Sequence, residues 1–208
     1  MTQLILGSML VGLIPLALIF TFNKLDKEFK DKLKIRKLDI VIIIAVAIIY
    51  GILYSRLGLT LGVFVNTTLL TAYLVFMSYT DQKTMLLYSS ISFIMISYEI
   101  IMIVVNYNII PFNEYTYTVL IILVVLGIMS IFRWIGLGDV YIYIVLALYY
   151  TQYRNLPTLT LMVNILLTNI LFIVVTVILK IIRKDKEKHQ PLTIFIAIST
   201  FICNLFLI

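Results

Sequence analysis

Residues 38–55 read LDIVIIIAVAIIYGILYS, an almost unbroken apolar run in which Asp39 is the one charged residue. A helix needs about 20 mainly apolar residues to cross the hydrocarbon core of a bilayer. Similar runs occur along the whole chain. We expect helical segments at 3–22, 38–55, 58–80, 89–107, 115–133, 139–152, 158–182 and 191–208. The sixth run is short, and we expect its helix to start at the glycines that precede residue 139.

The composition also indicates a membrane protein. Apolar residues make up 62% of the 208 residues and charged residues 12%, whereas soluble domains are about 45–50% apolar. We therefore predict an all-α, polytopic membrane protein with about eight transmembrane helices. We expect one transmembrane domain over residues 1–208, with the lipid bilayer as its surroundings.

The basic residues determine the expected orientation. Fourteen of the sixteen Lys and Arg residues fall in or beside the connections on one side, within Asn23–Lys37, at Lys83 and Arg133, and within Lys180–Lys188. Arg56 and Arg154 fall on the other side. The positive-inside rule makes the first side cytoplasmic, so both termini should face outward. Topology thus accounts for the net charge of +6, and we expect no nucleic-acid partner.

Metal and cofactor chemistry have little support in the sequence. It contains a single cysteine, Cys203, and a single histidine, His189. Structural zinc sites use four His or Cys ligands. We therefore expect neither a metal site nor a cofactor.

Two acidic residues stand at the predicted cytoplasmic boundary. Asp81 ends the third run and Asp139 opens the sixth. Carboxylates are costly at a membrane edge, so these two are candidates for function. Peptide hydrolysis by a carboxyl pair needs one ionised group to activate water and one protonated group to polarise the carbonyl. Gly136 and Gly138 precede Asp139, and without Cβ atoms they permit a sharp turn and the close approach of a substrate backbone.

These residues resemble the motifs of a known family. Gly136-Leu137-Gly138-Asp139 is similar to the GxGD motif of the prepilin and preflagellin leader peptidases, which are polytopic aspartyl proteases. Asp81-Gln82-Lys83 resembles the start of that family's D-x-K/R-x4-P-N motif. The segment Pro191–Ala197 resembles a proline-rich stretch of the last helix, through Pro191, Phe195 and Ala197. The chain departs from the family at three positions, which are Tyr88 and Ser89 in place of Pro-Asn and Tyr141 in place of a lysine.

The resemblance implies an activity and a place in the cell. Asp81 and Asp139 would be the catalytic pair, supported by Gly136, Gly138 and Lys83. The substrate would be a type IV prepilin or a competence-type pseudopilin, cut at the cytoplasmic face of a prokaryotic plasma membrane. Bifunctional members carry a long cysteine-bearing loop for N-methylation. Since the Asn23–Lys37 connection has no cysteine, this chain resembles the protease half alone.

Glu99, in the middle of the fourth run, leaves an alternative open. A charge there would be costly, so we expect a neutral carboxyl group bonded to a polar neighbour such as Asn66, Asn164 or Asn169. Those asparagines are themselves expected to link helices. The alternative function is a small ion- or proton-coupled transporter that uses Glu99 with Asp81, and a non-catalytic scaffold is a third interpretation. The sequence leaves the pilin system and the oligomeric state open.

Overall fold

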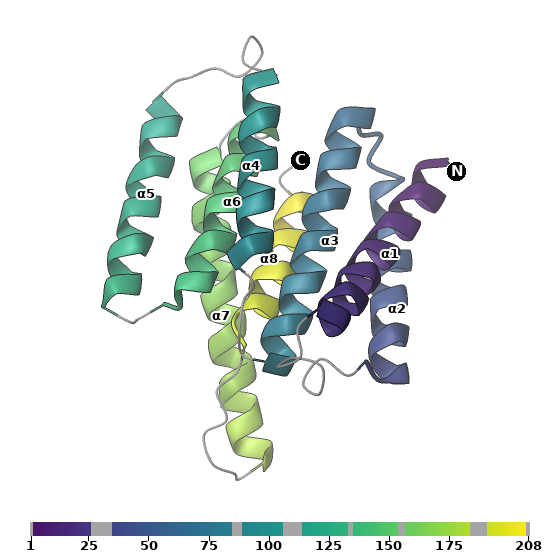
Figure 1. The fold of residues 1–208 in the computed structure, drawn as a ribbon. Coiled ribbons are helices and arrows are strands. Elements are labelled where there is room, and N and C mark those ends of the chain that lie inside the picture. Colours follow the sequence, from purple (N-terminus) through teal and green to yellow (C-terminus); the bar gives the residue numbers. More distant parts are fainter. Residues whose placement is uncertain are drawn as a thin grey trace. The chain divides into compact units, whose positions relative to one another are not determined.

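The computed structural model describes residues 2–25, 35–84, 89–105, 114–132, 135–153, 157–183 and 191–206. Within these ranges the chain is all-α, as predicted, with eight helices in the expected order (Figure 1). The helices are α1 (Thr2–Leu25), α2 (Lys37–Tyr54), α3 (Leu61–Thr84), α4 (Ser89–Val105), α5 (Glu114–Ile131), α6 (Leu137–Tyr153), α7 (Pro157–Arg183) and α8 (Thr193–Phe206). Tyr88, Arg133, Arg154, His189 and most of the basic residues of the two charged connections lie outside the described residues.

The lengths of the helices fit a membrane protein. Among the described residues, α1, α2, α3 and α7 are long and apolar enough to cross a bilayer, and α4, α8 and the end of α5 are shorter apolar helices. Large apolar side chains cover the outer faces of α2 and α7, for example Val41, Ile49, Ile173 and Ile181. Such surfaces are stable in lipid and would be exposed to water in a soluble protein.

The chain divides into two compact units, Met1–Met85 and Leu86–Ile208. The predicted single domain over residues 1–208 stays a prediction. In the first unit, α1 packs against both α2 and α3. Gly51 makes the contact with α1 possible, since a Cβ atom there would lie 2.8 Å from the carbonyl oxygen of Leu4 and would collide with Ser8. The fully buried rings of Tyr50 and Tyr54 stack with centroids 4.3 Å apart.

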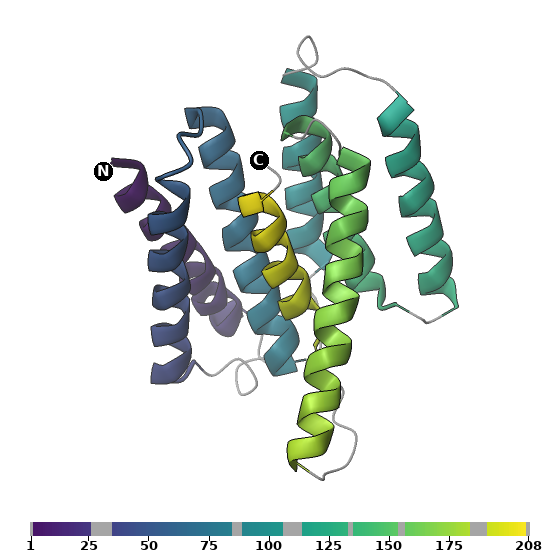
Figure 2. The ribbon, with the colours of Figure 1, turned by 180° about the vertical axis from the view of Figure 1, so that it is seen from behind.

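Helix α6 is the centre of the second unit. It packs against α4, α5 and α7, and α8 packs against α7 (Figures 1 and 2). The side chains of Ile142, Val145, Leu146 and Tyr149 are fully buried. This burial explains how a helix of 17 residues, the short sixth run of the sequence, is stabilised.

Polar side chains join the helices of the second unit. The Asn164 amide on α7 donates to the hydroxyl of Thr200 on α8 at 2.9 Å and to that of Tyr150 on α6 at 3.2 Å. The predicted role of Asn164 in linking helices is therefore confirmed. The same prediction is wrong for Asn169, which is exposed and donates to the carbonyl oxygen of Ile165 in its own helix.

Candidate active site

Asp139 lies in the first turn of α6. The N–H groups of Asp139 and Val140 donate to the carbonyl oxygen of Gly136, at 3.0 and 3.3 Å. These bonds start the helix at Leu137, so the predicted start at the glycines is confirmed. A carboxylate in the first turn of a helix faces unpaired N–H groups and the positive end of the helix dipole, both of which favour a negative charge.

Gly136 leaves room for the carboxylate of Asp139. A Cβ atom built at Gly136 would lie 3.0 Å from Oδ2 of Asp139, which is closer than an ordinary contact. The carboxylate therefore folds back over Gly136, in space that any other residue would occupy. From the sequence, we expected Gly136 to permit a sharp turn and the close approach of a substrate. The structure adds a steric reason for glycine at this position.

Thr193 is a polar neighbour of Asp139 within the second unit. This buried residue opens α8, and its hydroxyl donates to Oδ1 of Asp139 at 3.5 Å. The nearby Phe195 packs edge-on against Phe172 of α7, with ring centroids 5.6 Å apart, and so fixes the start of α8. The sequence drew attention to Pro191, Phe195 and Ala197 in this segment but missed Thr193.

Asp81 lies in the last turn of α3 and is only 8% exposed. The predicted end of this helix, at residue 80, is wrong, because α3 continues to Thr84. The hydroxyl of Thr84 bonds to the carbonyl oxygen of Thr80 at 2.7 Å, and Lys83 is held by an ion pair, so the last turn is well supported. Asp81 belongs to the first unit and Asp139 to the second, so the pairing of their carboxyl groups stays a prediction.

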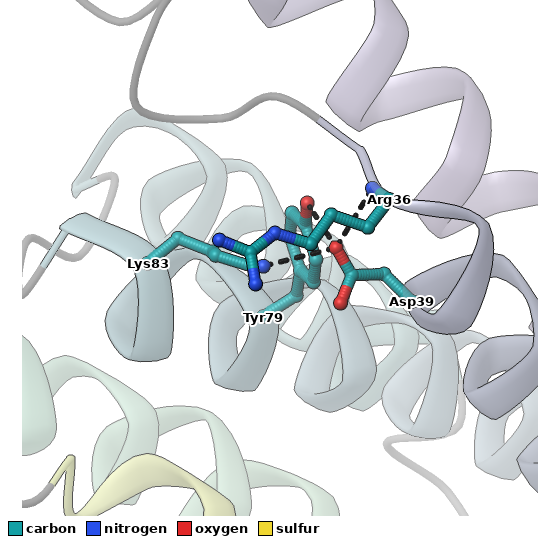
Figure 3. A network of polar contacts seen from close by, with 4 residues as sticks. All are labelled: Arg36, Asp39, Tyr79 and Lys83. Atoms are coloured by element: carbon teal, nitrogen blue, oxygen red, sulfur yellow. Dashed lines mark hydrogen bonds and ion pairs between the residues drawn. The ribbon is translucent and has the colours of Figure 1, made fainter.

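Lys83 contacts a carboxylate that the sequence analysis did not assign to the site. Its Nζ atom lies 2.9 Å from Oδ2 of Asp39, in the first turn of α2 (Figure 3). The hydroxyl of Tyr79 reaches the same oxygen at 3.4 Å. The N–H of Arg36 donates to it at 3.0 Å and so caps the start of α2. Asp39 therefore joins the beginning of α2 to the end of α3.

Glu99 is fully buried in α4. The side-chain amide of Gln152 on α6 donates to its Oε2 atom at 2.7 Å and to its backbone oxygen at 3.3 Å. A polar neighbour of the predicted kind is thus present, and this one, Gln152, was not among the three asparagines proposed from the sequence. The departure at Tyr141 also has a structural role, since its ring packs against Phe93 of α4 with centroids 5.2 Å apart.

No group of three or more His, Cys, Asp or Glu side chains suited to a metal ion occurs in the described part of the chain.

Comparison with known protein families matches residues 68–208 to the type IV leader peptidase family. The chain belongs to the type IV leader peptidase family. The match covers well over half of the sequence and includes both Asp81 and Asp139. Comparisons with curated proteins and with solved structures match nothing to this chain. As a family member, the chain is a leader-peptidase-like membrane protease.

Proposed function

We propose that this leader peptidase family member is an aspartyl endopeptidase that removes the leader of type IV prepilin-like or pseudopilin precursors. Asp81 and Asp139 are its catalytic pair. The observation that carries the proposal is the family match over residues 68–208, a range that contains both acids in the motifs identified from the sequence. The support from the structure is that each acid lies in a terminal turn of its helix, in α3 and α6.

The proposed chemistry needs the two carboxyl groups in different states. The ionised group takes a proton from a water molecule, whose oxygen attacks the scissile carbonyl carbon. The protonated group donates to the carbonyl oxygen, and the proton taken from water then goes to the leaving amine. Two close carboxylates favour this arrangement, because like charges resist double ionisation.

The contacts within each unit support a cytoplasmic site. In the first unit, the Asp39–Lys83 ion pair joins the end of α3 to the start of α2, and α2 begins at the last residue of the basic stretch Asn23–Lys37. In the second unit, the Thr193–Asp139 hydrogen bond joins the start of α6 to the start of α8, which follows the basic segment Lys180–Lys188. Both basic segments are cytoplasmic under the positive-inside rule.

The proposed substrate suits a site at the membrane boundary. A prepilin has a short basic leader followed by an apolar helix, and this helix partitions into the bilayer and brings the cleavage point to its edge. The enzyme's own cytoplasmic segments are basic, so anionic lipid headgroups would hold the leader near the surface. The transporter alternative has no comparable support, since the family match indicates a peptidase.

Co-expression with a prepilin tests the proposal. The wild-type chain should convert the precursor to a product that lacks the leader, as measured by mass spectrometry of the product N-terminus. A precursor whose apolar helix carries two inserted lysines is the matched control, and it should remain uncut. The proposed function would be contradicted if the chain is folded in the membrane but cuts none of several prepilins and pseudopilins.

A further inference from the structure

One oxygen atom of the Asp39 carboxylate, Oδ2, interacts with three donor groups. Oδ2 receives the ammonium group of Lys83 at 2.9 Å, the backbone N–H of Arg36 at 3.0 Å and the hydroxyl of Tyr79 at 3.4 Å (Figure 3). The ammonium group of Lys83 also lies 5.6 Å from the centre of the Tyr79 ring. These four residues thus form one network, which we call the Asp39 anchor.

The Asp39 anchor is partly removed from solvent. The side chain of Lys83 is 20% exposed and that of Asp39 is 14% exposed. The attraction between two charges is screened less at this depth than on an open surface, and the loss of one partner leaves the other charge in an unfavourable place. The network therefore holds the two helix ends in one arrangement.

A second polar bridge joins the same two helices at a distance from the anchor. The hydroxyl groups of Tyr50 on α2 and Thr68 on α3 lie 2.9 Å apart and are buried. Tyr50 is eleven residues after Asp39, and Thr68 is eleven residues before Tyr79. Eleven residues are about three helical turns, or about 16 Å. The two bridges therefore lie on one face of α2 and on one face of α3, about three turns apart, as expected for two antiparallel helices.

The anchor determines which way Asp81 faces. Tyr79 and Lys83 are four residues apart and share one face of α3, the face that Asp39 holds. Asp81 is two residues from each of them, and a step of two residues turns about 200° around a helix. The side chain of Asp81 therefore leaves α3 on the side opposite to α2. Any rotation of the last turn would carry Asp81 with it.

We infer that Asp39 is a positioning residue for Asp81, acting through Lys83 and Tyr79. The inference rests on the proposed function, because it assigns Asp81 to the reaction. The role of Lys83 in the D-x-K motif is then to bind Asp39 and so to hold the last turn of α3 in place. The motif assigned Lys83 a supporting role without indicating what it supports.

A double-mutant cycle tests the inference in the full-length enzyme. Asp39→Asn and Lys83→Met should each lower kcat for prepilin cleavage by roughly 10-fold to 100-fold, with KM changed by less than about twofold, because misplacement affects the chemical step. The double variant should be no worse than the poorer single variant, since both changes break one contact. Asp39→Glu, which keeps the charge, should recover most of the lost kcat. Additive losses, or an unchanged kcat in Asp39→Asn, would overturn the inference.

A second measurement does not depend on catalysis. In a Cys203→Ser background, Asp81→Cys places the single thiol at a buried position, and its rate of reaction with a water-soluble maleimide reports the orientation of the last turn. Adding Asp39→Asn should raise that rate by about fivefold or more. Tyr50→Phe is the matched control, since it removes the distant bridge and keeps the anchor, and it should change the rate by less than about twofold.

The two measurements separate the two proposals. If the wild-type enzyme cuts no prepilin but Asp39→Asn still raises the labelling of the thiol introduced at position 81, the proposed function fails and the positioning role of Asp39 survives. If cleavage occurs and Asp39→Asn leaves the labelling unchanged, the positioning role fails and the peptidase remains.

Discussion

Replacing Gly136 by Ala is the most informative small change at Asp139. The new Cβ atom would lie 3.0 Å from Oδ2, where an ordinary contact begins at 3.4 Å, so a shift of about 0.4 Å is required. The atom that it meets is the end of the Asp139 side chain, which swings more easily than the helix moves. The substitution should therefore displace the carboxylate and cost only about 0.5–1 kcal/mol of folding stability, the usual difference between Gly and Ala at a helix start.

The effect on the reaction should be larger than the effect on stability. A misplacement of a catalytic group by about 1 Å can cost roughly 100-fold in rate. A shift of about 0.4 Å thus predicts a roughly tenfold lower kcat on a prepilin, measured with purified enzyme in lipid nanodiscs. Gly127→Ala in α5 is the matched control, since a Cβ atom there meets nothing within 4 Å.

The control should keep its kcat within about twofold and gain up to about 1 kcal/mol of stability, as Gly→Ala does in a helix. A wild-type kcat in a folded Gly136→Ala variant would contradict the expected displacement of the Asp139 carboxylate. It would mean that the position of the carboxylate over Gly136 is not the one used in cleavage.

Other changes test the remaining contacts, the orientation and the product. Thr193→Val should lower kcat by roughly threefold to tenfold, because it removes a long hydrogen bond to Asp139, and Thr193→Ser should restore it; equal rates in both variants would contradict this. Glu99→Gln should keep most activity, since Gln still accepts the Gln152 amide; a complete loss would place Glu99 in the chemistry. A cysteine at residue 30 should be labelled only from the cytoplasm, and labelling of intact cells from outside would refute the orientation. Mass spectrometry of the trimmed substrate should show a free N-terminal amine, and a methyl group that depends on this protein alone would be inconsistent with the short first connection.

The helices were predictable because their signal is local. Apolar runs define α2 and α4 within two residues at each end, and the glycines before Asp139 indicate where α6 begins. The end of α3 was placed four residues too early, since Asp81, Gln82 and Lys83 read as the start of a polar connection. The helix continues to Thr84, and the ion pair of Lys83 with Asp39 and the bond from the Thr84 hydroxyl to the carbonyl oxygen of Thr80 support its last turn. The ion pair joins two helices, so no local pattern indicates it.

The missed site residues share one physical cause. Asp39 and Lys83 are 44 residues apart in the sequence, Glu99 and Gln152 are 53 apart, and Asp139 and Thr193 are 54 apart. Each contact joins two helices that are far apart in the sequence, whereas periodicity reports only which face of one helix is apolar. The sequence identified Asp81, Lys83, Gly136 and Asp139 by their motifs, but their partners become visible only in the packed helices.

If Asp81 and Asp139 together cut a leader peptide, single-turnover cleavage by purified variants will depend on both carboxyl groups. Asp81→Asn and Asp139→Asn keep the size of each side chain and remove its ability to exchange a proton. Each variant should bind a prepilin with near wild-type affinity, and each should lower the cleavage rate by at least about 1,000-fold, as should the double variant. If either single variant still trims the prepilin at near the wild-type rate, the two-carboxylate mechanism is wrong.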